Sequence, residues 1–403
     1  MKFEIQHDDQ TFRREVRAFI AANLRPEIAA RGVMDYDPRE ADVREWMGVL
    51  DRRGWSVPNW PEAYGGVSWS PLQKHIFAQE LRRARAPVLD RVGTELVGPV
   101  LIAFGSDWQK RELLPRIRSG ADWWGQGFSE PGAGSDLASL RTRAERIADD
   151  FVINGQKIWT TCAQYAQWFI VLVRTDQQAR PQSGISVLLV EADRPGITRR
   201  PIESIDGGFT LNEIFFDDVR VPARNLVGEI NKGWSYTKYL LMHERTISAE
   251  VPHTQRDIDQ LKRIAATTRK HGRPLIEDPH FRLSIAKLEA DVMALEWAVL
   301  RVLYTDSDDK KRNSVASVLK LRGNELRQQV ADLCVDALGE MGVALFVDPS
   351  EPLARADDRV WPELSEAEAK GVSVRAIFRR AVSIYGGSNE IQREIISKSI
   401  LGL

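Results

Sequence analysis

Residues 129–136 read Ser129-Glu130-Pro131-Gly132-Ala133-Gly134-Ser135-Asp136, and residues 154–161 read Asn154-Gly155-Gln156-Lys157-Ile158-Trp159-Thr160-Thr161. The glycines and small hydroxyls of the first stretch predict a turn whose backbone N–H groups can approach a ligand closely. In the second stretch, Asn154-Gly155 predicts the tight turn of a hairpin. The strand that follows should place Trp159 and Thr161 on one side. Small hydroxyls and amides beside an indole suit a flat ring that is rich in heteroatoms.

Composition limits the class of protein. The chain has 403 residues, enough for two or three packing units, and a formal net charge of −1, which argues against a nucleic-acid surface. Cys162, expected to be buried, and Cys334 are the only cysteines; they form no C-x-x-C pair, which favours a reducing compartment. The sequence shows no secretory signal, no membrane-spanning apolar run and no histidine cluster at metal spacing. We therefore expect a cytoplasmic protein without a nucleic-acid partner, a membrane span or a metal site.

Periodicity divides the chain into three zones. Residues 1–120 show helical spacing, 121–228 show short apolar runs typical of strands, and 229–403 return to helical spacing. We therefore predict an α+β fold in which a strand-rich domain lies between two helical ones. The acid- and proline-rich stretch 348–370 predicts an irregular excursion. The helical stripes of the first zone comprise Phe12, Val16, Phe19, Ile20, Val43, Trp46, Met47 and Leu50.

Five short segments occur in the order that one enzyme family shows. Besides the two opening stretches, they run from Gly54 to Gly66, from Phe216 to Gly228 and from Ser388 to Arg393. Together they resemble the acyl-CoA dehydrogenases along essentially the whole chain. The resemblance implies the acyl-CoA dehydrogenase fold, with a helical N-domain, a central β-barrel-like domain and a C-terminal four-helix bundle. It also implies FAD as cofactor, dehydrogenation of an acyl-CoA thioester to a trans-2-enoyl-CoA, and an electron-transferring flavoprotein as electron acceptor.

Such a reaction needs a base for the weakly acidic α-proton and a donor to the thioester oxygen. Family members place the base at one of two positions, and the first of these is Gly386 here, directly after Tyr385. The second position matches Glu244, so the resemblance implies Glu244 as the catalytic base. On residue type alone, a helix glutamate is more often a surface residue. Gly386 would offer its backbone N–H to the thioester oxygen and leave room for a bulky acyl group.

The same resemblance implies the residues that contact the flavin. Gln126, Phe128 and Ser129 would lie beside the pyrimidine edge of the ring, and Trp159 and Thr161 near its N5. A tryptophan on a strand is more commonly a core residue, which is the alternative for Trp159.

Four further residues match family positions at the cofactor or the substrate. Ser388 and Glu390 belong to the C-terminal flavin-domain motif, where Ser388 is also placed to cap the last helix. Arg245 matches a residue near coenzyme A, and a salt bridge on a helix surface is its alternative. Ser135 matches a residue near the pantetheine, and a turn-forming serine is its alternative.

One part of the pattern departs from the family, which holds part of FAD with residues of a neighbouring subunit. Thr268 and His271 replace the expected Arg and Phe, and Pro279 replaces a Gln. Asp336 and Glu340 replace a Gln and a Gly, and two acids near a pyrophosphate would repel it. This combination resembles the large subunits of heteromeric bacterial acyl-CoA dehydrogenases of the pimeloyl-CoA and steroid side-chain types. It implies an α₂β₂ assembly with a related subunit, and a homo-oligomer is the alternative.

Two rival functions stay open on sequence. An acyl-CoA oxidase would differ in passing its electrons to O₂, and a non-catalytic structural subunit would only stabilise an active partner. The acyl group is open as well, with steroid side chains, dicarboxylates and branched chains as candidates.

Overall fold

The computed structural model describes residues 7–32, 39–247, 249–304, 309–343 and 371–403. Within these ranges, the side chains of 241–247, 309–314, 341 and 343 are outside the description. The excursion expected at 348–370 therefore lies outside the described residues.

Helices dominate the first part of the chain. They are α1 (His7–Asn23), α2 (Pro26–Arg31), α3 (Glu40–Arg53), α4 (Pro71–Arg83), η2 (Val92–Val97), α5 (Gly98–Phe104) and α6 (Asp107–Ser119). Ser70 and Ser106 cap α4 and α6 with reciprocal side-chain and backbone hydrogen bonds. The predicted apolar stripes are confirmed, with Phe19 partly buried and the other members buried: Phe12, Val16, Ile20, Val43, Trp46, Met47 and Leu50.

A mixed sheet follows the helices. Its strands are β1 (Trp124–Gly127), β2 (Arg143–Ile147), β3 (Asp150–Thr161), β4 (Trp168–Arg174), β5 (Ile185–Glu191), β6 (Ile197–Ile202) and β7 (Leu211–Pro222). The order is β1-β4-β2-β3-β7-β6, with β5 paired to β4. The apolar runs of β4 and β5 are buried almost throughout, because both faces of these strands are covered.

The predicted hairpin turn at Asn154-Gly155 is wrong. Strand β3 runs straight through these residues and pairs with both β2 and β7. The tight turn lies instead at Ala148 and Asp149, between β2 and β3, where Ala148 has φ of 54°. At Gly155 the register to β7 shifts and φ is +149°, and an added Cβ would lie 2.6 Å from the Cα of Thr142. Asn154-Gly155 therefore marks a β-bulge, where only glycine allows this close backbone approach.

The rest of the chain is mainly helical. Its elements are α7 (Gly233–Ile247), α8 (Val251–Thr267), the short strands β8 (Arg269–Lys270) and β9 (Arg273–Pro274), α9 (Pro279–Tyr304), α10 (Asp309–Leu338), α12 (Val372–Phe378) and α13 (Asn389–Ile396). The β8–β9 hairpin was not expected from the sequence. Its turn is at His271 and Gly272, both with positive φ. Ser388 caps α13 as predicted, since its hydroxyl accepts from the Ile391 N–H at 3.4 Å.

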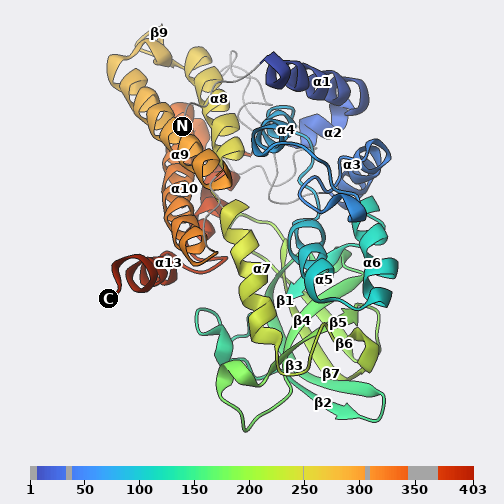
Figure 1. The fold of residues 1–403 in the computed structure, drawn as a ribbon. Coiled ribbons are helices and arrows are strands. Elements are labelled where there is room, and N and C mark those ends of the chain that lie inside the picture. The colour runs from blue at the N-terminus through green and yellow to red at the C-terminus, as the bar shows by residue number, and fades with distance from the viewer. Residues whose placement is uncertain (1–6, 33–38, 248, 305–308, 344–370) are drawn as a thin grey trace.

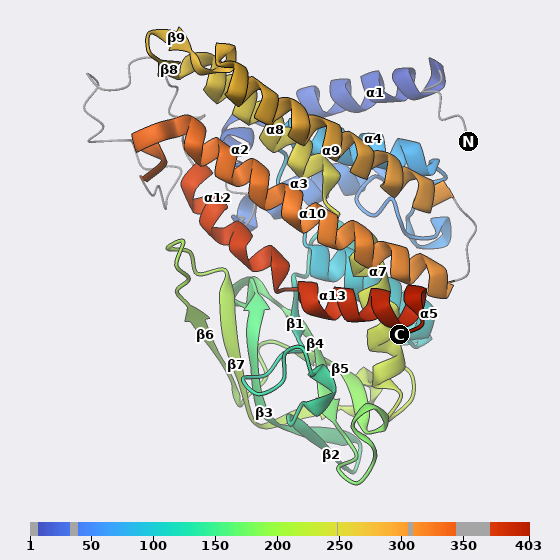
Figure 2. The same ribbon diagram turned by 90° about the vertical axis from the view of Figure 1, so that its left-hand side faces the viewer.

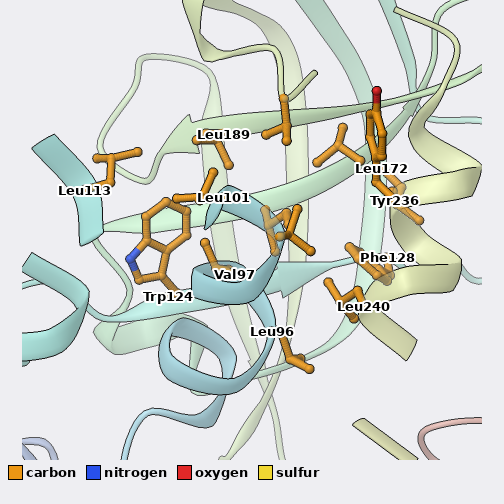
Figure 3. Packing of buried hydrophobic residues seen from close by; sticks show 14 of the residues in the cluster. Leu96, Val97, Leu101, Leu113, Trp124, Phe128, Leu172, Leu189, Tyr236 and Leu240 are labelled. Carbon is orange, nitrogen blue, oxygen red and sulfur yellow. The ribbon is translucent and has the colours of Figure 1, made fainter. Parts of the chain in front are cut away.

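The helices of the two ends meet above the sheet, as Figures 1 and 2 show. Helix α7 lies along β5 and connects the strands to the C-terminal helices (Figure 1). A buried cluster joins η2, α5, β1 and α7, in which Trp124 lies beside Val97 and Leu101 and Phe128 lies near Leu240 (Figure 3). This cluster fixes the start of α7 against the end of β1. Among the described residues, no helix combines the length and the apolar character needed to cross a membrane.

Candidate functional site

The glycine-rich turn is tied to β3 by backbone hydrogen bonds. The Ile158 N–H donates to the Ser129 carbonyl at 2.9 Å, and Glu130 and Ala133 exchange two backbone hydrogen bonds of 3.0 Å. Gly132 and Gly134 have open space where a side chain would stand. Residues 129–136 and 154–161 therefore form one unit, which leaves room beside the turn for a ligand.

A buried ion pair lies beneath this unit. Lys157 of β3 is fully buried, and its Nζ donates to the Glu130 carboxylate at 2.8 Å and to the Phe128 carbonyl at 3.0 Å. Glu130 also accepts from the backbone N–H groups of Arg141 and Thr142, at 2.6 and 2.9 Å. Burial lowers the pKa of Lys157 to about 8, against the opposing effect of Glu130. Burial raises the pKa of Glu130, but Lys157 and the hydrogen bonds from Arg141 and Thr142 together lower it further, so the net shift is downward.

The end of β3 presents two side chains to solvent. Trp159 is 55% exposed and has φ of 62°, at a second break in the register with β7. Thr161 is exposed as well, while Thr160 between them is buried and donates to the Gln126 carbonyl at 3.2 Å. Trp159 and Thr161 thus share the exposed side, as the strand pattern predicts, and the core position considered as the alternative for Trp159 is wrong.

The other predicted flavin residues differ in exposure. Gln126 of β1 and Ser129 of the turn are half-buried, whereas Phe128 is 5% exposed and belongs to the core cluster of Figure 3. Ser135, assigned to the substrate, is exposed at the far end of the turn. Gln126, Ser129, Trp159 and Thr161 therefore lie on one joined unit, built from β1, the turn and β3.

Helix α7 carries the predicted base and its neighbour. Tyr236 and Leu240 are buried in the core cluster next to Phe128, and Glu244 follows at the next i+4 position of the same helix face. Arg245 comes directly after it. The side chains of both residues lie outside the description, so their contacts stay a prediction.

The remaining predicted residues lie on the segment that leads into α13. Gly386 has φ of 63° and Gly387 has φ of 86°. Glu390 is exposed in the first turn of α13, and its pKa is lowered by its own backbone N–H and by the Ser388 hydroxyl. In both ribbon views this segment lies between the C-terminal helices and the strands (Figures 1 and 2).

Sequence reasoning missed three charged residues around these segments. Lys157 and Glu130 form the buried pair, and Lys320 of α10 donates to backbone carbonyls just before α13. The partners of these lysines lie 27 to 67 residues away in the sequence. No local pattern marks such lysines as buried, because a charged residue within an element normally indicates an exposed position.

The joined unit fits a flavin ring. An exposed indole, half-buried amide and hydroxyl groups, and open space beside Gly132 and Gly134 match a flat, heteroatom-rich group. Within the described residues, no group of three or more His, Cys, Asp or Glu is placed to hold a metal ion.

Comparison with known proteins covers nearly the whole chain. Models of the N-terminal, middle and C-terminal domains of acyl-CoA dehydrogenase match residues 6–121, 125–219 and 231–401. Acyl-CoA dehydrogenase IpdE1 of Mycobacterium tuberculosis is 37% identical, over 98% of each chain. The solved structure titled Tcur3481-Tcur3483 steroid ACAD has a TM-score of 0.84 and 30% identity, covering 100% of this chain and 99% of that chain.

The ChsE4-ChsE5 complex from Mycobacterium tuberculosis has a TM-score of 0.81 and 31% identity, with coverage of 100% and 99%. Three consecutive family domains, relatives of nearly equal length and the same fold lead to one conclusion. The chain belongs to the acyl-CoA dehydrogenase family, whose members are oxidoreductases that generally bind FAD.

Proposed function

We propose that this chain is an FAD-dependent acyl-CoA dehydrogenase that converts an acyl-CoA thioester to its trans-2-enoyl-CoA. The observation that carries the proposal is the joined unit of turn and strand, which exposes Trp159 and Thr161 beside open space. Gln126, Phe128 and Ser129 are proposed to hold one edge of the flavin, with Ser388 and Glu390 contributing from α13. The proposed domain limits are 1–120, 121–228 and 229–403.

We propose a residue for each step of the reaction and for binding coenzyme A. Bound FAD would supply the acceptor for the hydride of the substrate's β-carbon. Glu244 takes the α-proton, and the backbone N–H of Gly386 donates to the thioester oxygen as negative charge develops there. Ser135 and Arg245 are proposed to contact coenzyme A.

The substitution Glu244→Gln tests the base. It should keep FAD bound, because the flavin contacts lie on other elements, and lower turnover by about 100- to 10,000-fold, the usual contribution of a general base. The readouts are FAD per chain and anaerobic bleaching of the flavin by acyl-CoA. Glu394→Gln, at an exposed side chain of α13, is a control for loss of a carboxylate. A Glu244→Gln enzyme with near-normal bleaching rates would remove Glu244 from the base position.

The acyl group is proposed to be bulky. Gly386 has no side chain, and one similar solved structure is titled a steroid ACAD. Steroid side chains, branched chains and dicarboxylates are the classes to compare, each as its CoA thioester, by anaerobic bleaching. Fastest bleaching by a short straight-chain acyl-CoA would contradict the proposal of a roomy pocket.

Assembly and electron acceptor complete the proposal. A related second chain is the proposed partner, supported by the likeness to the ChsE4-ChsE5 complex and by the substitutions at Thr268 and Glu340. An electron-transferring flavoprotein is the proposed acceptor. Oxygen consumption on substrate addition would favour an oxidase instead, and a colourless protein purified with its partner would favour a structural subunit.

A further inference from the structure

A buried lysine holds the segment that contains Gly386. Lys320 of α10 is 1% exposed, and its Nζ lies 2.5, 2.8 and 2.7 Å from the carbonyl oxygens of Tyr385, Gly386 and Gly387. A lysine ammonium has three N–H donors, so each carbonyl can accept one. The Gln392 side-chain amide donates to the last two of these carbonyls, at 3.4 and 3.0 Å.

This arrangement fixes the direction of three peptide groups. In a trans peptide the N–H points opposite to the carbonyl of the preceding residue, and the described chain has no cis peptide bond. Because three carbonyls converge on Lys320, the N–H groups of Gly386, Gly387 and Ser388 must point away from α10. Within the part of the chain that the structure describes, none of these three N–H groups has a hydrogen-bond acceptor.

The backbone conformation supports a role in binding. Gly386 and Gly387 both have positive φ, and consecutive N–H groups in such turns form concavities that bind negatively charged oxygens. Lys320 also polarises the carbonyls that it contacts, which strengthens the N–H donors of the same peptide groups. Burying an ammonium costs free energy unless the group is well hydrogen-bonded. An apolar side chain would pack between the helices without that cost, so packing alone does not explain a lysine at this position.

We propose that Lys320 is a positioning residue, which aims the Gly386 N–H and its two neighbours at the oxygen of the substrate thioester. It acts through the backbone and does not touch the substrate. The inference rests on the proposed function, because the role of the Gly386 N–H is part of that proposal.

The test compares two variants of the FAD-loaded enzyme, purified with its partner subunit if one is required. Lys320→Met keeps an unbranched side chain but removes the three donors. It should lower kcat about 100-fold, the usual effect of losing one donor to a developing oxyanion, while KM and FAD per chain stay unchanged. The control is Gln328→Met on the same helix, which removes a hydrogen bond of 3.0 Å to the Arg379 carbonyl and should leave kcat unchanged.

Two results would overturn the inference: a kcat for Lys320→Met equal to that of the wild type, or a loss of kcat that only follows a loss of FAD. If Lys320→Met does not fold, Gln392→Leu takes its place, since it removes donors to two of the same carbonyls. Retained FAD with kcat lowered about tenfold then supports the inference, and unchanged kcat overturns it.

Failure of the proposed function shows separately, because the wild-type flavin would then not be bleached by any acyl-CoA. In that case the crystal structure of Lys320→Met decides on positioning. A Tyr385–Gly386 peptide rotated from its wild-type direction supports the inference, and an unchanged peptide overturns it.

Discussion

Trp159 combines two features that are rarely found together. Its indole is 55% exposed, and its backbone has a positive φ of 62°. A bulky residue in this region costs about 1–3 kcal/mol, and such strain persists mainly where the surroundings enforce it. Here the hydrogen bond from Ile158 to Ser129 and the pairing of Thr160 with Asn212 hold the strand on either side. The flavin that we propose near this indole would explain why the strain is kept.

The substitutions Trp159→Ala and Thr161→Val should weaken FAD binding or shift the flavin absorption spectrum. Neither should unfold the chain, because both side chains are exposed. The measurements are the visible spectrum, the FAD dissociation constant and the thermal midpoint. Ile147→Ala, at an exposed position of β2, is a control for loss of an exposed side chain in the same sheet. Unchanged spectra and affinity in both variants would place the flavin elsewhere.

Single residues also show where sequence reasoning reaches its limit. Ser388 was predicted as a cap because the cap and the helix it closes are adjacent in sequence. Lys157 and Lys320 were not predicted as buried, since their partners come from distant turns of the chain. Glu244 follows only from the family resemblance, because a glutamate on a helix is ordinarily a surface residue.

At the scale of elements, the sequence predicts which segments are helices and which are strands better than it predicts where the turns between them lie. The apolar runs of β4 and β5 and the stripes of α1 and α3 are buried because their periodicity matches their elements. The prediction of a turn at Asn154-Gly155 is wrong because the pairing of β3 with β2 and β7 outweighs a local turn preference. The same dipeptide signal that marks a hairpin therefore marked a bulge.

Asp90 links two elements of the core. Its carboxylate accepts from the Gly93 N–H at 3.2 Å, near the start of η2, and from the Trp124 N–H at 3.0 Å, at the start of β1. Its side chain is buried, with 3% of the residue exposed. Burial raises the pKa of Asp90 to about 7, although the backbone N–H groups oppose the shift.

This raised pKa makes stability depend on pH. Between the ordinary value of 3.8 and about 7, folded Asp90 binds a proton that the unfolded chain releases. Its contribution is therefore fully present below the lower value and is lost as the pH rises toward 7, by at most about 1.4 kcal/mol per pH unit. Asp90→Asn should flatten the decline of the thermal midpoint across this range, and Asp107→Asn, at an exposed residue of α6, should not. Parallel curves for wild type and Asp90→Asn would contradict the assignment.

At the scale of the whole molecule, the residues that differ from the family pattern lie together at one end. The β8–β9 hairpin and the C-terminal end of α10 lie at the same end of the helical domain in Figure 2. His271, Asp336 and Glu340 are exposed there, and Thr268 is half-buried. Of the cations on the hairpin, Lys270 is paired with Asp278 at 2.9 Å. The family resemblance implies that this end would contact the diphosphate and adenosine of an FAD bound by a neighbouring subunit.

We therefore expect this chain to function with a related, different partner, as an α₂β₂ assembly with one FAD per heterodimer. In a homo-oligomer every flavin would meet Thr268, His271, Pro279 and Glu340 of its neighbour. Loss of one charge-assisted contact to phosphate removes about 1.5–3 kcal/mol, and the added acids repel a diphosphate. Expressed alone, the chain should therefore bind less than one FAD per two chains.

A repaired chain provides the matched control for this expectation. The combination Thr268→Arg, His271→Phe, Pro279→Gln and Glu340→Gly restores the family's residues at the exposed end. If the departures cause the deficit, the repaired chain should hold more FAD than the wild type when each is expressed alone. Full flavin occupancy and normal turnover in a wild-type homo-oligomer would instead mean that other cations at this end, such as Arg269 or Arg273, take over the contact with the diphosphate.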